Sequence, residues 1–291
     1  MPLVATANLN NSRTLCEYLL AFPRGCRRQR ASWWIMPFYD EQGGPLDRIF
    51  LVQRSPRHFQ LLRPISFLEA GRPEAQRVNI PAHDPDRPAV GDNQTDLASV
   101  PPFLWGLVAS YGRQTAPALL HDHLSDEARH GDPATRIARR RVADRLFGVA
   151  LLDSGISILR MLIMRSFVSV QKYLEFRRWQ AYAMVGHALL GMAFVYAVIG
   201  TVMGYWAASV GSSLWMLLLL LVPAATMLAW WRDTVTMIVI VYTGAVFAPF
   251  ILSAALAELV LLLAEGIVWL VGGRRGPVPV IGPTILARRR P

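Results

Sequence analysis

The chain has 291 residues, enough for one soluble domain of ordinary size and a second unit. Its hydrophobic share of 53% and mean hydropathy of +0.30 are high for a soluble protein, and the apolar excess follows residue 183. Residues 1–182 hold 24 Lys and Arg against 17 Asp and Glu, which is typical of a mildly basic soluble domain. The two cysteines, Cys16 and Cys26, exclude a disulfide scaffold and suit a reducing compartment.

The net charge of +10 does not by itself indicate a nucleic-acid partner. Such a site would need clustered arginines interleaved with exposed aromatic side chains on one face. The run from Arg24 to Arg30, followed by Trp33 and Trp34, comes nearest to this pattern. We expect no nucleic-acid partner, because the basic residues are explained more simply by the apolar segments that they flank.

Residues 1–45 carry weak patterns and are expected to form a variable N-terminal segment. Short β-prone runs follow, separated by Pro and Gly, and they predict two or three strands. These runs are residues 49–53, 59–67 and 76–80. Residues 82–92 are rich in Pro and Gly and are expected to be a loop.

Three helices are predicted after the strands. Pro117 suits the first turn of a helix over residues 115–129. Two further helices are expected over residues 134–152 and 156–176. Short strands followed by helices predict an α+β fold for the soluble domain.

Most polar side chains that could carry chemistry lie between Thr95 and Leu124, and another lies on the second helix. The candidate catalytic residues are Asp96, Ser99, His121, Asp122 and Asp144. Asp144 is spaced from apolar neighbours so that it falls on a buried helix stripe, where a carboxylate needs a partner. His121 or Arg165 could supply that partner.

Three interpretations of these residues are open. In the first, His121, Asp122 and Asp144, with Asp96 as a further candidate, hold a divalent metal that activates water for hydrolysis. In the second, His121 is a general base acting on Ser99, although no Gly-flanked nucleophile turn surrounds that serine. In the third, the residues form a buried polar network that fixes the loop 95–101 against two helices.

The last third of the chain contains four apolar segments. They lie at residues 183–207, 213–231, 234–250 and 251–271. A spanning helix needs about 20 apolar residues, so the last two segments are too long together for one crossing. We therefore predict a turn at Ala248-Pro249-Phe250 and four transmembrane helices within residues 177–272.

Charge placement predicts the orientation of these segments. Four spans place every flanking arginine, including the basic tail at residues 273–291, on one side of the membrane. Both termini are therefore expected to be cytoplasmic. Glu258 and Glu265 share one helix face, which raises the alternative of a small transporter, but few other polar residues accompany them.

The polar stretch resembles a known family. The pattern consists of Thr95-Asp96-Leu97-Ala98-Ser99-Val100-Pro101, then Tyr111-Gly112-Arg113, then His121-Asp122-His123-Leu124, then Ala143-Asp144-Arg145-Leu146-Phe147. It resembles the DUF1353 family of tailed phages, prophages and bacteria over residues 46–176. Ser125 departs from the tyrosine usual in that family.

The resemblance implies a small α+β domain whose characteristic polar residues are Asp96, His121, Asp122 and Asp144. It implies no activity, and it leaves the membrane segments outside the family. Together with the charge pattern, it predicts a multi-pass protein of a bacterial inner membrane.

We expect a membrane-anchored protein with a cytoplasmic DUF1353-like domain, which would be a metal-assisted hydrolase using His121, Asp122 and Asp144. The alternative is a non-enzymatic, membrane-tethered scaffold or interaction module. The expected partner is the lipid bilayer. The substrate, the metal, any protein partner and the oligomeric state are left open.

Overall fold

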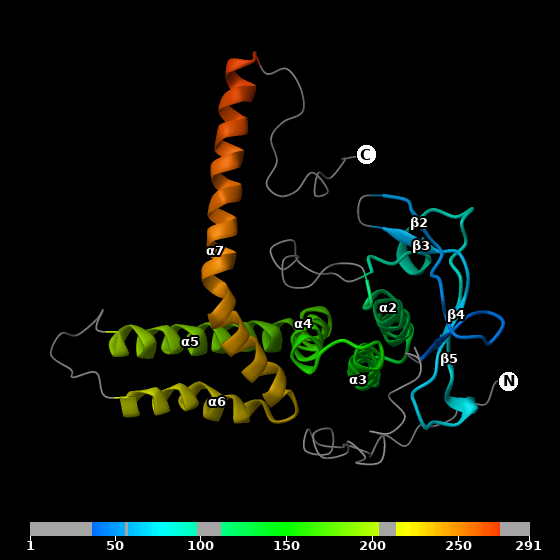
Figure 1. Ribbon diagram of the computed structural model, residues 1–291, viewed down its shortest axis with the longest axis horizontal. Helices are drawn as coiled ribbons and strands as arrows, with labels where there is room; N and C mark the ends of the chain where they lie inside the picture. The colour runs from blue at the N-terminus through cyan, green and yellow to red at the C-terminus, as the bar shows by residue number, and fades with distance from the viewer. Residues whose placement is uncertain (1–36, 56–57, 98–111, 204–213, 274–291) are drawn as a thin grey trace. The chain divides into compact units, whose positions relative to one another are not determined.

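The structure is a computed structural model, and it describes residues 37–55, 58–97, 112–203 and 214–273 (Figure 1). All of them belong to one compact unit of the chain. The fold is mixed α+β. Short antiparallel strands come first in the chain, and helices follow them. The predicted α+β class of the soluble part is therefore confirmed.

Five short strands form two antiparallel sheets. A three-stranded sheet has the order β1-β4-β5, with β1 at Phe38–Tyr39, β4 at Ile65–Phe67 and β5 at Val78–Ile80. A two-stranded sheet pairs β2 (Leu51–Gln53) with β3 (Phe59–Leu61). The predicted run 59–67 is two strands. Strand β1 was not predicted, and it lies before residue 46, within the segment expected to be variable.

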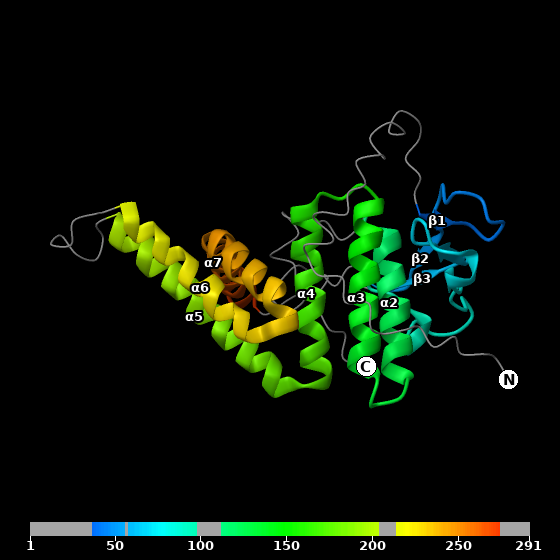
Figure 2. The same ribbon diagram turned by 90° about the horizontal axis from the view of Figure 1, so that it is seen from below.

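Three helices follow the strands and lie side by side in both views (Figures 1 and 2). Helix α2 spans Thr115–His130, α3 spans Arg136–Asp153 and α4 spans Ile158–Phe176. All three agree with the predicted helices to within two residues. The short 3-10 helices η2 (Glu74–Gln76) and η3 (Gly91–Asn93) lie between the last strands and α2.

The soluble core lies between the sheets and α2. Phe38 of β1, Phe67 of β4 and Leu120 of α2 are all buried in one hydrophobic cluster. A second cluster joins α3 to α4 through Phe147, Leu151 and neighbouring methionines. This packing places the polar face of α2 toward α3 and α4, where the candidate residues lie.

The apolar part begins at α5 (Arg178–Val202) and continues through η5 (Leu214–Leu220), α6 (Leu221–Met227) and η6 (Leu228–Asp233) into α7 (Thr234–Val271). The chain changes direction at Trp231, whose φ of 48° interrupts the helix before α7. Buried residues of α4, α5 and α7 form a third hydrophobic cluster, which includes Tyr173, Met184 and Val241.

The turn predicted at residues 248–250 is absent. Helix α7 is one continuous helix of 38 residues with Pro249 in its interior. A proline removes one backbone hydrogen bond from a helix, whereas a turn within this apolar run would leave more backbone groups without partners. Among the described residues, two segments are long and apolar enough to cross a membrane, Arg178–Val202 and Leu217–Val271.

Candidate functional site

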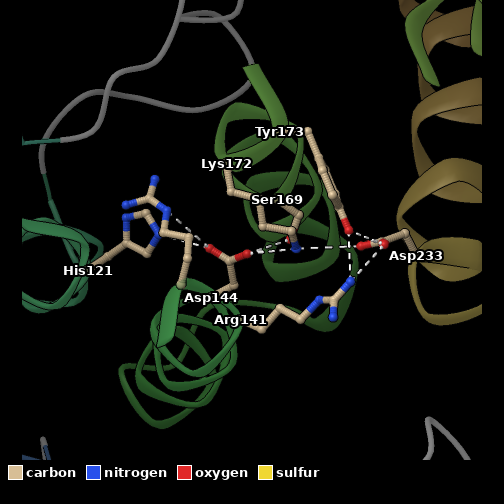
Figure 3. A network of polar contacts seen from close by, with 8 residues as sticks. His121, Arg141, Asp144, Ser169, Lys172, Tyr173 and Asp233 are labelled. Carbon is tan, nitrogen blue, oxygen red and sulfur yellow. Dashed lines mark hydrogen bonds and ion pairs between the residues drawn. The ribbon is translucent and has the colours of Figure 1, made fainter. Parts of the chain in front are cut away.

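His121 and Asp144 are in contact at the centre of the helical layer (Figure 3). His121 is on α2 and Asp144 is on α3, and both side chains are buried. The distance from His121 Nε2 to Asp144 Oδ1 is 3.1 Å. This contact confirms His121 as the partner expected for the buried Asp144 carboxylate. The ring of His121 also stacks against Phe147, with 4.9 Å between centroids.

The second oxygen of Asp144 is bound by α4. Ser169 Oγ donates a hydrogen bond to Asp144 Oδ2 at 3.1 Å, and Lys172 Nζ contacts the same oxygen at 3.1 Å. Burial alone would raise the pKa of Asp144, but the His121 hydrogen bond and the Lys172 charge outweigh it and lower the pKa to about 2. Asp144 is therefore ionised at neutral pH.

The protonation of His121 follows from this environment. Burial lowers the pKa of His121, against the opposing effect of its hydrogen bond to Asp144. The imidazole is therefore neutral at pH 7. Because the Asp144 carboxylate can only accept a hydrogen bond, Nε2 of His121 must carry the proton. A histidine held in this tautomer orients a carboxylate and is not free to accept a proton at Nε2.

Lys172 extends the network toward the apolar helices. Its Nζ lies 3.4 Å from Oδ1 of Asp233, which immediately precedes α7. Tyr173 donates a hydrogen bond of 2.6 Å to the other oxygen of Asp233 and accepts one from Arg141 at 2.9 Å. Figure 3 shows these side chains in a continuous series from α2 to the start of α7. Burial and then the bond to Asp233 raise the pKa of Tyr173 to about 12.

Asp122 is directed to a different partner. Thr95 Oγ1 donates a hydrogen bond of 2.5 Å to Asp122 Oδ2, and the same Oγ1 accepts the backbone N–H of Leu97 at 3.0 Å. Leu97 has a φ of 62°, a conformation that is uncommon outside glycine, and its side chain is buried in the core. Asp122 therefore holds a strained loop against α2.

At this loop the charge of Asp96 acts on the carboxyl group of Asp122. Burial, and then the charge of Asp96, raises the pKa of Asp122 well above its usual range. This environment favours the protonated form of Asp122 relative to a free aspartate. Asp96 thus lies near Asp122, whereas Ser99, the proposed nucleophile, lies outside the described residues.

The structure brings His121 and Asp144 together but not the third proposed metal ligand. Asp122 bonds to the Thr95 loop, and both oxygens of Asp144 already have partners. Within the described ranges, no group of three or more His, Cys, Asp or Glu side chains is placed to hold a metal ion. The residues present therefore do not fit the metal site that the first interpretation requires.

Sequence reasoning missed the residues that complete the network, which are Ser169, Lys172, Tyr173, Arg141 and Asp233. One signal was available, because Lys172 is the only lysine in a chain with 30 basic residues. It stands on a mostly apolar helix, where a lone cation needs a carboxylate. Lys172, rather than the suggested Arg165, is the charged partner of Asp144.

A cavity of about 690 Å³ lies beside this network. Its walls come from the residues around β5 and η3, from α2 and from α4, and they include His121, Asp122 and Arg140. This volume lies within the ~300–1,000 Å³ of small-molecule sites. The cavity is therefore large enough for a small ligand next to the candidate residues.

Comparison with known proteins places this site within a family. The model of the family described as "Protein of unknown function (DUF1353)" matches residues 91–170, which contain Asp96, His121, Asp122, Asp144 and Ser169. The chain therefore contains a DUF1353 family domain, and the resemblance expected from the sequence is confirmed. No curated protein and no solved structure matches the chain.

Proposed function

We propose that the protein is a membrane-tethered, non-enzymatic interaction module whose DUF1353 domain is joined firmly to its apolar helices. One observation carries this proposal: Lys172 contacts both Asp144 of the domain and Asp233 at the start of α7, at 3.1 and 3.4 Å. The characteristic DUF1353 aspartate is thus part of the attachment between the domain and the apolar part.

The bonding of the candidate residues supports a structural role for them. His121 donates to Asp144, Asp144 accepts from α4, and Asp122 accepts from Thr95. Buried polar side chains that are hydrogen-bonded to one another stiffen and specify a fold. This arrangement corresponds to the interpretation in which the polar residues fix the loop and the helices.

The apolar helices support membrane attachment. Beyond residue 245, α7 exposes nearly all of its side chains, and Phe250, Leu256 and Val268 are more than half exposed. An exposed apolar surface of this extent marks contact with a membrane or another protein. Because Arg177, Arg178 and Arg232 flank the segments, we propose that the DUF1353 domain faces the cytoplasm of a bacterial cell.

The four-span topology is part of the same proposal. Helix α7, at 1.5 Å per residue, is about 57 Å long, whereas the hydrocarbon layer is about 30 Å thick. Four spans would require α7 to bend back near Pro249, where the structure has one continuous helix, so this topology is proposed from the placement of the arginines alone. A C-terminal fluorescent-protein fusion tests this, because it fluoresces only on the cytoplasmic side; a dark, full-length fusion would refute the four-span topology.

Membrane tethering is tested by fractionating cells that express the full chain. We expect the protein in the membrane fraction after washing with alkaline carbonate, and we expect it in solution only with detergent. Release by carbonate would show a peripheral association and contradict the proposal.

The metal-assisted hydrolase stays a prediction, and its test is separate. The full chain and His121→Ala are purified in detergent and dialysed, and bound metal is measured by mass spectrometry. Stoichiometric metal in the parent that is lost in the variant would replace the structural interpretation by the hydrolytic one.

A further inference from the structure

Arg140 on α3 is a buried arginine whose Nε atom lacks a hydrogen-bond partner among the described residues. Its exposed fraction is 2%. Nε has no hydrogen-bond partner, and the carboxylate oxygen recorded nearest to it, Asp144 Oδ1, lies at 3.9 Å. That separation exceeds the length of a hydrogen bond.

Asp144 accepts hydrogen bonds from its other partners but not from Nε of Arg140. One Asp144 oxygen accepts from His121, and the other contacts both Ser169 and Lys172. Lys172 is shared with Asp233, which also faces Arg141 at 3.7 Å. The network therefore holds three cations, Arg140, Arg141 and Lys172, against two carboxylates, Asp144 and Asp233.

The ion pair of Arg140 with Asp144 is long, at 3.9 Å, and it leaves Nε without a hydrogen bond among the described residues. Burying a charge requires a paired and hydrogen-bonded partner, or the fold loses several kcal/mol. Arginine offers five N–H donors in a planar fork that matches carboxylate and phosphate groups. A buried arginine with unused donors is thus suited to an anion that comes from outside the network.

Arg140 lines the cavity described above, so such an anion has space to bind. Five aspartates also line the cavity, namely Asp84, Asp92, Asp96, Asp122 and Asp126. Asp126 is paired with Arg129 at 2.9 Å and Asp92 lies 3.9 Å from Arg87, so arginines balance these two, and burial raises the pKa of Asp122.

Part of the cavity wall is apolar. Helix α4 contributes Ile163, Met164, Phe167 and Val168 to it. A purely inorganic anion would leave this surface without a contact, whereas an alkyl or aryl group would cover it.

We propose that this cavity binds a small organic anion, with its carboxylate or phosphate group on Arg140 and its apolar body against α4. The site is distinct from membrane tethering, since none of its named residues belongs to the apolar helices α5 to α7.

Isothermal titration calorimetry on the full chain in phosphatidylcholine nanodiscs tests the proposal. The probes are sodium octanoate, octyl phosphate, inorganic phosphate and octanol, and empty nanodiscs correct for partitioning into lipid. We expect one octanoate or octyl phosphate per chain, and much weaker binding of inorganic phosphate and octanol. Comparison of the two organic anions identifies which head group the site prefers.

The variant Arg140→Met removes the charge and keeps much of the volume. It should weaken octanoate binding about tenfold or more, the loss expected for a charge-assisted hydrogen bond. Arg139→Met is the matched control, because Arg139 precedes it on the same helix, is exposed and does not line the cavity; binding should be unchanged.

A variant that binds nothing could simply be unfolded. The melting temperature of each variant is therefore measured without ligand. Arg140→Met should melt at the same or a higher temperature than the parent, because it removes a buried charge whose Nε has no hydrogen-bond partner among the described residues. Equal octanoate binding by parent and variant, no binding by the parent, or a lower melting temperature of Arg140→Met would each overturn the proposal. Carbonate extraction is unaffected by these outcomes, so failure here is distinguishable from failure of membrane tethering.

Discussion

At the scale of single residues, Lys172 joins the two parts of the molecule. It is buried, with 3% of its side chain exposed, between Asp144 and Asp233. A lysine ammonium is a compact charge that can donate to two carboxylates from one point, whereas the arginine fork is larger and planar. This explains why the one lysine of an arginine-rich chain stands at this position.

We expect Lys172→Met to destabilise the protein strongly. The substitution leaves two buried carboxylates without their shared cation, and breaking a buried pair in this way costs about 3–5 kcal/mol. Thermal melting of the full chain in detergent measures the effect. The exposed Arg160 is on the same helix, so Arg160→Met is the control and should change stability by less than about 0.5 kcal/mol. An equal melting temperature for parent and Lys172→Met would show that the cluster does not hold the helices together.

Replacing Asp122 by asparagine should change the stability of the protein much less than replacing Asp144 by asparagine. The raised pKa of Asp122 shows that its surroundings disfavour the charged carboxylate, so the uncharged amide of Asp122→Asn suits them, and the amide oxygen can still accept from Thr95. We expect a stability change below about 1 kcal/mol. Asp144 is ionised between His121 and Lys172, so Asp144→Asn should cost several times more.

Denaturant or thermal unfolding at pH 7 compares these two variants directly. A metal site would give a different result, because replacing any carboxylate ligand would lower metal affinity. Similar losses for Asp122→Asn and Asp144→Asn would contradict the assigned protonation states.

Sequence reasoning found only part of the site at this scale. The apolar spacing around Asp144 predicted that it is buried and needs a partner, and it left His121 and Arg165 as alternatives, of which the structure shows His121. Asp233 lies 89 residues beyond Asp144, and no local pattern connects them. Such a long-range pair depends on how α4 packs against α7, which composition and periodicity do not determine.

At the scale of elements, helix positions in the soluble part were predictable because Pro and Gly mark their ends. The predicted and observed bounds of α2 to α4 agree closely. The fate of Pro249 was not predictable in the same way, since a proline in an apolar run is compatible with a kink or a turn. In the structure the backbone bonds of α7 continue past it.

The packing of α5 on α7 relies on a small residue. A Cβ atom at Gly191 of α5 would lie 3.1 Å from both terminal carbons of Val241 on α7. We expect Gly191→Leu to force the helices apart and destabilise the protein by about 1–3 kcal/mol, the usual cost of overpacking. Thermal melting in detergent measures this loss.

Gly186 provides a matched control on the same helix. Nothing lies within 4 Å of a Cβ atom placed there, so Gly186→Leu should be tolerated and should slightly favour the helix. Destabilisation by both substitutions would point to the lipid or detergent environment of α5, and would contradict a specific contact between α5 and α7.

At the scale of the whole molecule, the predicted division into a DUF1353 domain and an apolar part did not anticipate the contacts between them. Sequence composition changes sharply near residue 183, whereas buried contacts run from His121 on α2 to Asp233 before α7. Composition reports which environment a segment prefers. It does not report ion pairs that cross the boundary between two environments.

Asp153 shows how one unsatisfied group should affect the stability of the whole protein. It is the last residue of α3, where the helix dipole disfavours a negative charge, and its Oδ2 is buried without a hydrogen bond among the described residues. Burial, and then the charge of Glu69, raises its pKa to about 6.

The raised pKa defines the direction and range of the effect. Between pH 3.8 and about 6 the folded state binds the proton of Asp153 more tightly than the unfolded state, so this group reduces stability as the pH rises through that range. Asp153→Asn removes the ionisation. We expect the variant to match the parent at pH 4 and to be more stable at pH 7, by about 1–2 kcal/mol after allowance for partial exposure.

Melting temperatures of parent and variant at pH 4, 5, 6 and 7 measure this difference, which should grow with pH and level off above about 6. Asp47→Asn is the control, because 87% of the Asp47 side chain is exposed and its replacement should give no such trend. A difference that is constant with pH would mean that the Asp153 carboxyl group titrates alike in the folded and unfolded chains.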